Sequence, residues 1–122
     1  MRTVSIIGAG RTKFSEHWNQ SLRDLSTEAS MNAIENSKIN DKELEAIYVG
    51  CMASGRFIGQ EHLGALVADH LGLNPLPSTR LEAACASGGV ALRNAYLSIV
   101  SGQHDMVLVC GVEKMTEVSG GQ

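Results

Sequence analysis

Short apolar runs alternate with segments of helical spacing along the chain, and this alternation is the strongest constraint on its fold. Runs rich in Val and Ile occupy residues 3–9, 46–52 and 105–113, and a further extended segment leads from Ser78 to Ala84. Continuous apolar runs of this length are typical of strands that are buried on both faces. The intervening helical segments supply the crossovers that parallel strands need. The sequence therefore predicts an α/β fold in the order βαβαβαβ, with a mostly parallel sheet and helices on its faces.

Two of the predicted helices have clear start or stop signals. Ser21 is a suitable N-cap for a helix over 21–37, because Asp24 follows three residues later and can bond back to it. Residues 60–71 place Leu side chains and Val67 on one face, and Gly72 follows as a stop. The remaining predicted elements are a short turn capped by Asp41, a helix over 86–100 ended by Gly102, and loops over 53–59 and 116–122.

Composition and charge exclude several classes of protein. The chain has 122 residues, of which 43% are hydrophobic, enough for one modest domain with its own core. A net charge of −3 and an aromatic content of 4% argue against a partner such as nucleic acid or an anionic membrane. No run approaches the roughly 18 apolar residues of a membrane span, and the amino-terminal apolar run is too short for a signal peptide. With three cysteines and no CxxC pair, we expect a cytoplasmic protein with reduced thiols.

The spacing of glycines and histidines in this sequence does not match the motifs that bind a dinucleotide or a metal ion. Gly8 and Gly10 fit the start of a dinucleotide-binding turn, but Lys13 stands where the third glycine belongs, and a loop follows instead of a helix. None of the four histidines stands at metal-ligand spacing from another histidine or cysteine. We therefore predict no metal and no permanently bound cofactor. The sequence assigns no catalytic role to any histidine: His17, His62, His70 and His104.

Cys85 stands in a different setting from the other two cysteines. Cys51 and Cys110 lie in apolar strand-like runs, where a free cysteine behaves as a small hydrophobic residue. Cys85 follows an extended segment and precedes a helix, in the stretch LEAACASGGVAL. Free N–H groups and the macrodipole at a helix N-terminus favour the thiolate, which is the nucleophilic form of cysteine. The position suits a reactive thiol at a sharp strand-to-helix turn.

The residues around Cys85 are small. Alanines flank the sulfur, and Gly88 and Gly89 let a backbone or a thin ligand approach closely. The backbone N–H of Cys85 is a candidate donor to a developing oxyanion. From the residues alone two interpretations stay open: Cys85 is a nucleophile, or it is a small residue that allows tight strand–helix packing.

Four stretches of the chain resemble signatures of one family. EAACASGGVAL resembles the nucleophile motif of thiolases, especially the archaeal and sterol-carrier-protein-type branch. VSIIGAGRTKF followed by SLRDLSTEA is similar to the amino-terminal signature of that branch, and IYVGCMASG to its second strand and loop. VLVCGVEKMTE is similar to the strand after the nucleophile helix, with its Gly-x-Glu-x-Met pattern. The resemblance covers essentially the whole chain.

The resemblance implies a function and a role for Cys85. Thiolases join or split acyl groups carried on coenzyme A, so Cys85 is expected to accept an acyl group as a thioester, with acyl-CoA thioesters as substrates. The family also implies a homodimer or homotetramer, formed through the strand from Ser78 to Ala84. Complexes with a partner synthase and a small scaffold protein are implied for the archaeal type.

The chain departs from the family in length and in two motifs. Thiolases have several hundred residues in two similar halves, and their activating histidine and second acid/base lie in a carboxy-terminal half that this sequence lacks. Residues 1–122 are therefore expected to form part of a thiolase amino-terminal domain and to be a poor catalyst alone. Two alternatives remain: another condensing enzyme, such as a ketoacyl synthase or a hydroxymethylglutaryl-CoA synthase, or a non-catalytic module that binds acyl-CoA or lipid or forms complexes.

Overall fold

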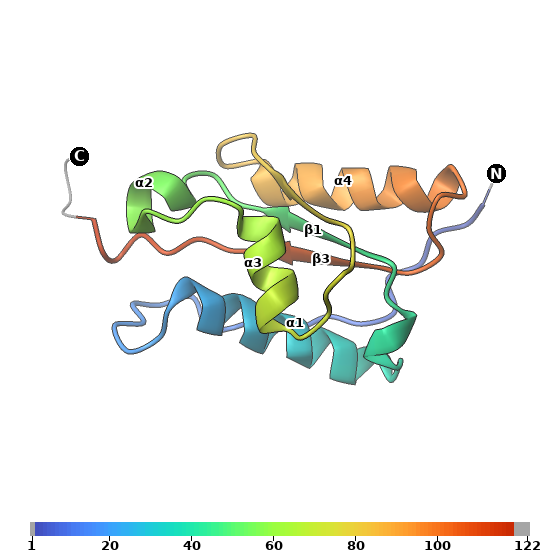
Figure 1. Cartoon of the computed structure of the whole chain (residues 1–122), viewed down its shortest axis with the longest axis horizontal. Coiled ribbons are helices and arrows are strands. Elements are labelled where there is room, and N and C mark those ends of the chain that lie inside the picture. Colours follow the sequence, from blue (N-terminus) through green and yellow to red (C-terminus); the bar gives the residue numbers. More distant parts are fainter. Residues whose placement is uncertain (1, 119–122) are drawn as a thin grey trace.

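A parallel sheet organises the computed structural model, which describes residues 2–118. The strands are β1 (Ala46–Gly50), β2 (Ser78–Leu81) and β3 (Val107–Gly111). The helices are α1 (Leu22–Ser37), the 3₁₀ turn η1 (Asp41–Glu43), α2 (Ser54–Ile58), α3 (Leu63–His70) and α4 (Ser87–Val100), as Figure 1 shows.

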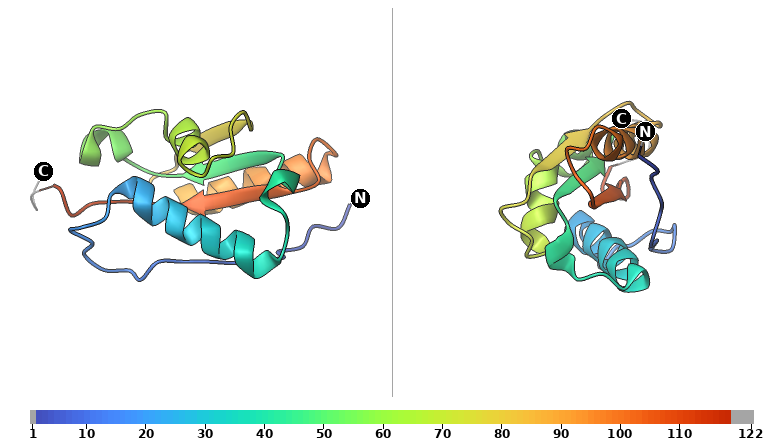
Figure 2. Two further views of the ribbon diagram at one scale, coloured as in Figure 1. Left: turned by 60° about the horizontal axis from the view of Figure 1, so that its bottom comes forward. Right: turned by 90° about the vertical axis from the view of Figure 1, so that its right-hand side faces the viewer.

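The three strands lie in the order β2-β1-β3, and both neighbours of β1 run parallel to it. Ile47 of β1 stands opposite Ser78 of β2 and Leu108 of β3, which fixes the register of the sheet. Helix α4 packs on one face of the sheet, and α1 and α3 lie on the other (Figures 1 and 2). This arrangement confirms the predicted α/β fold with a parallel sheet and helices on its faces.

The hydrophobic core surrounds the central strand. Ile47 and Val49 of β1 are fully buried, as a strand covered on both faces requires. Leu63 and Val67 of α3, a helix that packs against β1, are buried in the same cluster, which confirms the predicted apolar face of that helix. The buried cluster also contains Leu22, Leu25, Leu44, Cys51, Ala68, Leu73, Leu108, Cys110 and Val112.

Helix α1 begins as the sequence predicts. The hydroxyl of Ser21 accepts a hydrogen bond from the N–H of Asp24 (3.1 Å), and the Asp24 carboxylate accepts one from the N–H of Ser21 (2.8 Å). The prediction for Asp41 was wrong by one position. Asn40 caps η1, because its side-chain oxygen accepts from the N–H of Lys42 (3.0 Å), whereas Asp41 is already the first residue of the turn.

The predicted first strand, over residues 3–9, is not part of the sheet. The segment runs extended along α1 instead: Ala9 donates to the side chain of Asn36 (3.0 Å), and a Cβ on Gly8 would lie 2.5 Å from the carbonyl oxygen of Ala33. Ile6 and Ile7 are exposed. A cavity of about 800 Å³ separates the segment from β3 and α4. Strand propensity alone does not form a strand, since pairing needs a partner at ladder distance.

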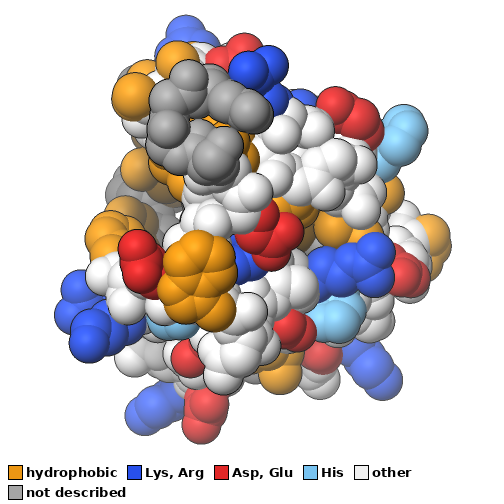
Figure 3. Space-filling model, turned by 90° about the vertical axis from the view of Figure 1, so that its left-hand side faces the viewer, with side chains coloured by type: hydrophobic (Ala, Val, Ile, Leu, Met, Phe, Trp, Pro, Cys, Tyr) orange, Lys and Arg blue, Asp and Glu red, His pale blue; other side chains and the backbone are white. Residues whose placement is uncertain are grey.

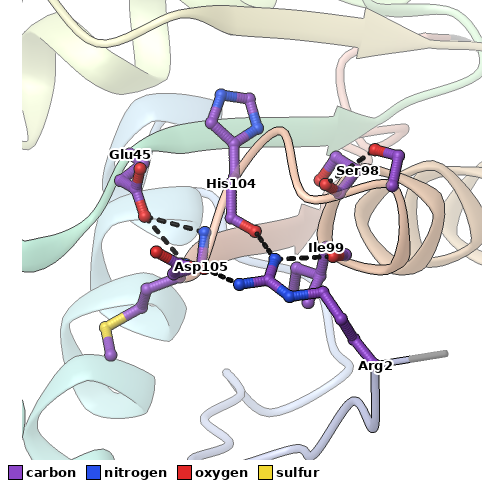
Figure 4. A network of polar contacts seen from close by, with 8 residues as sticks. Arg2, Glu45, Ser98, Ile99, His104 and Asp105 are labelled. Atoms are coloured by element: carbon purple, nitrogen blue, oxygen red, sulfur yellow. Dashed lines mark hydrogen bonds and ion pairs between the residues drawn. The ribbon is translucent and has the colours of Figure 1, made fainter.

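Polar contacts hold the start of this segment (Figure 4). The guanidinium of Arg2 donates to the carbonyl oxygens of Ile99 (2.9 Å) and His104 (3.2 Å) and pairs with Asp105. The carboxylate of Glu45 accepts from the N–H of Asp105 (2.8 Å) on the other side of the same loop. These contacts fix the amino-terminal segment next to the loop between α4 and β3.

Several predicted boundaries shift. The strand expected over 46–52 ends at Gly50, the one expected over 105–113 spans Val107–Gly111, and the one expected from Ser78 to Ala84 ends at Leu81.

Residues 53–59 were predicted as a loop, but 54–58 form helix α2, which ends where Gly59 adopts φ +69°. Helix α3 begins at Leu63, three residues later than predicted. The loop predicted over 116–122 lies partly outside the described residues, which end at Val118.

Within residues 2–118, the helices are too short or too polar to cross a membrane.

Candidate functional site

Cys85 lies in a tight turn that leads from β2 into α4. The chain leaves the strand after Leu81, and Ala84 adopts φ +51°, a left-handed conformation that residues with a side chain rarely take. This conformation explains why the strand does not continue to Ala84 as predicted. Cys85 follows at once and is exposed, and α4 begins two residues later. The structure therefore places Cys85 where the sequence predicts it, at the start of a helix.

The backbone around Cys85 is held by hydrogen bonds on both sides. The N–H of Ala86 donates to the carbonyl oxygen of Ala83 (3.0 Å), and the N–H of Ser87 donates to that of Ala84 (3.1 Å). The carboxylate of Glu82 accepts from the N–H of Ala84. These bonds fix the direction in which the Cys85 side chain leaves the backbone.

Helix α4 presents an uncapped N-terminus beside Cys85. Ala86 occupies the N-cap position, and no side chain among residues 2–118 caps this end of the helix. The first N–H groups of an α-helix have no partner within the helix, so they favour negative charge nearby. An exposed thiol at this position is well placed for nucleophilic chemistry.

Glycine is required at Gly50 in β1 rather than at Gly88 or Gly89. A Cβ on Gly50 would lie 2.5 Å from the carbonyl oxygen of Ser87 and 2.8 Å from the Cα of Gly88. A Cβ on Gly88 or Gly89 would meet no atom of the described residues within 4 Å outside its own chain neighbours and the adjoining backbone of α4. The close approach predicted near Cys85 is therefore one between the end of β1 and the first turn of α4, and the space beside Gly88 and Gly89 is open.

Cys85 opens into a cavity of about 660 Å³ at the carboxyl end of the sheet. The ends of β1 and β3 contribute Met52 and Glu113, and the amino-terminal loop contributes Lys13 and Phe14. Figure 3 views this end of the molecule, where hydrophobic side chains are interspersed with charged ones. The carboxyl ends of parallel strands are the usual place for a ligand in α/β folds.

Two residues that the sequence analysis did not select fix the loop after β1. Arg80 of β2 donates to the carbonyl oxygens of Cys51 (3.2 Å) and Met52 (2.8 Å). The carboxylate of Glu113, just after β3, accepts from the N–H of Met52. Glu113 belongs to the Gly-x-Glu-x-Met pattern, which was a signal for it, whereas nothing in the sequence indicated Arg80.

Lys114 holds the amino-terminal loop against the same end of the sheet. Its side chain is only 3% exposed, and its ammonium group donates to the carbonyl oxygen of His17 (2.8 Å) and to the hydroxyl of Thr116 (2.9 Å). Glu117 lies 3.6 Å from the same ammonium group. A lysine buried to this degree is uncommon. Here its partners come from the amino-terminal loop (His17) and from the segment after β3 (Thr116 and Glu117).

The other two cysteines are buried, as predicted. Burial raises the pKa of the Cys51 thiol, and the nearby carboxylate of Glu113 raises it further. Burial also raises the pKa of the Cys110 thiol. Both thiols are thereby kept neutral, whereas Cys85 is the exposed cysteine of the three.

The histidines do not gather around Cys85. His17 borders the cavity, but its Nε2 lies 2.6 Å from the carbonyl oxygen of Lys13 and is engaged there. His70 lies 4.0 Å from Asp24 and is not among the residues that line the cavity beside Cys85. Within residues 2–118, no three His, Cys, Asp or Glu side chains are close enough together to hold a metal ion.

Comparison with known proteins gives the same family as the motifs. Residues 4–122 match the family described as Thiolase, N-terminal domain. The chain is 55% identical over 118 residues to an acetyl-CoA acetyltransferase of Methanothermobacter thermautotrophicus, and the match covers 97% of this chain and 31% of that protein. It is 57% identical over 118 residues to an acetyl-CoA acetyltransferase of Methanocaldococcus jannaschii, covering 97% of this chain and 30% of the relative.

A solved structure has a similar fold. The acetyl-CoA acetyltransferase of Syntrophomonas wolfei superimposes with a TM-score of 0.75 at 23% identity, over 85% of this chain and 27% of that one. The chain therefore spans about a third of the length of the proteins that it matches. Together with the position of Cys85 at the start of α4, the match over residues 4–122 shows that this chain belongs to the thiolase family.

Proposed function

We propose that this chain carries the nucleophile of a thiolase-type acyl-CoA C-acyltransferase, and that Cys85 is that nucleophile. The observation that supports this most directly is the exposed thiol in a hydrogen-bonded turn at the uncapped N-terminus of α4, facing a cavity. Coenzyme A thioesters are the proposed substrates, and no permanently bound cofactor is proposed.

The proposed reaction proceeds in two steps. The Cys85 thiolate attacks the thioester carbonyl of an acyl-CoA, and the CoA thiolate leaves, giving an acyl-cysteine. A second acetyl-CoA loses an α-proton, and its carbanion attacks the acyl-cysteine to release a 3-ketoacyl-CoA and the Cys85 thiolate. Thiolytic cleavage is the reverse. The backbone N–H of Cys85 is proposed as one donor to the oxyanion of each tetrahedral intermediate.

Residues 1–122 are proposed to supply only part of this machinery. The groups that remove the thiol proton and the α-proton are assigned to the remaining part of a longer protein, because the relatives are about three times as long. Residues 1–122 would then be part of a thiolase amino-terminal domain, working in the cytoplasm.

Mass spectrometry of the full-length protein tests the proposal. Incubation with acetyl-CoA should add one acetyl group, and peptide mapping should locate it on Cys85. The Cys85→Ala variant should show no acetyl group and no acyl transfer but keep most of its affinity for CoA, whereas Cys110→Ala should behave as wild type. An unmodified wild-type protein that binds acyl-CoA equally well with and without the thiol would instead support a non-catalytic binding module.

The acyl donor decides between a thiolase and a related condensing enzyme. A thiolase uses CoA thioesters for both substrates, so acyl-carrier protein should not be required. Activity that depends on an acyl-carrier protein would contradict the thiolase assignment and favour a ketoacyl synthase.

A homodimer or homotetramer is proposed to form through β2. Ser78–Leu81 is an edge strand whose outer side pairs with no strand among the described residues. A two-fold axis would pair this edge with the same edge of a second copy and so protect it. Sedimentation should show an oligomer that Thr79→Lys, a charge on the exposed edge, converts to monomers. A wild-type monomer would contradict the proposal. Any partner synthase or scaffold protein would bind this oligomer.

A further inference from the structure

Within residues 2–118, Ser87 is the only residue of α4 whose hydroxyl bonds to the turn that precedes the helix. Its Oγ donates to the carbonyl oxygen of Ala84 (2.6 Å) and accepts from the N–H of Ala83 (2.9 Å). The side chain is almost completely buried, with 4% of the residue exposed. Ser98 and Ser101 of the same region also donate to a carbonyl three residues earlier, but within residues 2–118 neither accepts a backbone N–H.

The two bonds of Ser87 enclose Ala84, the residue with φ +51°. A left-handed conformation at a residue other than glycine persists only when its surroundings hold it. Here the Ser87 hydroxyl binds the backbone on both sides of Ala84, so it stabilises the conformation that turns the chain from β2 toward α4. Cys85 is the next residue, and its Cα–Cβ direction follows from that conformation.

The backbone of Ser87 packs against the end of β1. Its backbone carbonyl lies against Gly50 at the end of β1, where a Cβ would approach to 2.5 Å. The first turn of α4 therefore rests on the end of the central strand, and the Ser87 hydroxyl connects this fixed point to the turn that carries Cys85.

We infer that Ser87 is a positioning residue for Cys85: its hydroxyl holds Ala84 in the left-handed conformation and so aims the thiol at the acyl carbonyl. The inference rests on the proposed function of Cys85. It assigns no bond between Ser87 and the substrate, because the hydroxyl is buried and both of its bonds are made to the turn.

The test compares Ser87→Ala with Ser98→Ala in the full-length protein. Ser98 is a matched control, since it is equally buried in the same helix and makes the same kind of bond to a carbonyl (2.9 Å). The single-turnover rate of Cys85 acylation by acetyl-CoA should fall about tenfold to a hundredfold in Ser87→Ala, as expected when a reacting group is misplaced by about 1 Å. The KM for acetyl-CoA should change little. Ser98→Ala should stay within about twofold of wild type, since mutations far from a shared network act independently.

A second change distinguishes positioning from general loss of stability. Glycine adopts the left-handed conformation without steric cost, so Ala84→Gly introduced into Ser87→Ala should recover much of the acylation rate. This double variant also serves if Ser87→Ala alone does not fold. Absence of recovery, or equal losses in Ser87→Ala and Ser98→Ala that follow the fraction of folded protein, would overturn the inference.

Alkylation separates failure of this inference from failure of the proposed function. Iodoacetamide should modify Cys85 in the folded protein, and its rate with Ser87→Ala should be several-fold lower than with wild type. If wild type is not acylated by acetyl-CoA, the proposed function fails, and the alkylation rates alone decide the role of Ser87. An unchanged alkylation rate would then contradict it.

Discussion

Gly50 and Ser87 touch through their backbones at the point where the central strand meets the first turn of α4. A Cβ on Gly50 would lie 2.5 Å from the carbonyl oxygen of Ser87 and 2.7 Å from its carbonyl carbon. Backbone atoms cannot move aside as the end of a long side chain does. The contact therefore sets the distance between the sheet and the helix whose start carries Cys85.

Gly50→Ala should push α4 away from β1. We expect a loss of about 1–3 kcal/mol in the free energy of unfolding, the usual cost of overpacking, together with slower acylation of Cys85. Gly111→Ala is the matched control, because Gly111 pairs with Gly50 in the sheet. Among the described residues, its added Cβ would meet only the Cα of Gly88, at 3.9 Å. Urea unfolding should show the control neutral or stabilised by about 0.5 kcal/mol. Equal losses of unfolding free energy in both variants would show that the contact with Ser87 is not the cause of the loss in Gly50→Ala.

The capping box of α1 should make stability depend on pH at the acid end. Hydrogen bonds from the backbone and hydroxyl of Ser21 hold the pKa of the Asp24 carboxyl below its ordinary value. A carboxyl with a lowered pKa stabilises the fold above its ordinary pKa, and this contribution is lost as the pH falls through the lowered value.

Urea unfolding of the two single variants and the double variant measures this effect. Ser21→Ala should cost about 1 kcal/mol at neutral pH, a typical loss for an N-cap. The coupling between Ser21→Ala and Asp24→Ala should be clear at neutral pH and shrink as Asp24 becomes protonated. A coupling that does not change with acidification would contradict this assignment.

Lys114→Met should release the loop that borders the cavity. The variant loses two hydrogen bonds from a buried ammonium group and leaves the carbonyl oxygen of His17 with only the longer bond from the N–H of Gln20 (3.4 Å). Hydrogen bonds to charged groups contribute about 1.5–3 kcal/mol, so we expect a loss in that range. Lys42→Met changes an exposed lysine of η1 and should stay within about 0.5 kcal/mol of wild type.

Limited proteolysis adds a local readout to the Lys114 experiment. Cleavage between Arg11 and Trp18 should become faster in Lys114→Met than in Lys42→Met. Unchanged cleavage despite lower stability would show that the lysine supports the core but not the loop.

Only one of the three thiols should react in the native protein. Cys85 is exposed, whereas burial raises the pKa of Cys51 and Cys110 and keeps them as unreactive thiols. Mass spectrometry after iodoacetamide treatment near neutral pH should show, within residues 1–122, one modification in folded protein and three in urea. Native modification of Cys51 or Cys110 at a comparable rate would contradict their placement in the core.

The raised thiol pKa values also predict weaker folding at alkaline pH. An acid whose pKa is raised by folding stabilises the fold below its ordinary pKa, about 8.5 for cysteine, and loses this contribution as the pH rises toward the raised value. Urea midpoints should fall above that pH, and Cys110→Ala should reduce the fall. If the urea midpoint of Cys110→Ala falls by the same amount at alkaline pH, the loss of stability comes from groups other than Cys110.

The sequence alone determined the features that depend on local order along the chain. The periodicity of residues 60–71 placed Leu63 and Val67 in the core, and the spacing of Ser21 and Asp24 placed the start of α1, because these signals act within one or two turns. The same holds for Cys85: an extended run, a cysteine and a helical segment in sequence put the thiol at a helix start.

Only the tertiary structure decided what depends on partners distant in sequence. Residues 3–9 have the composition of a strand but lie along α1, because strand formation needs a neighbour at ladder distance and α1 binds the segment instead. The hydrogen bonds of Arg80 to the loop after β1 and of Lys114 to His17 span 28 to 97 residues of chain, so no local pattern could indicate them. The sequence predicted a close approach at Gly88 and Gly89, whereas the structure requires glycine at Gly50, for the same reason. Close approach is a property of two segments, and the sequence shows them only one at a time.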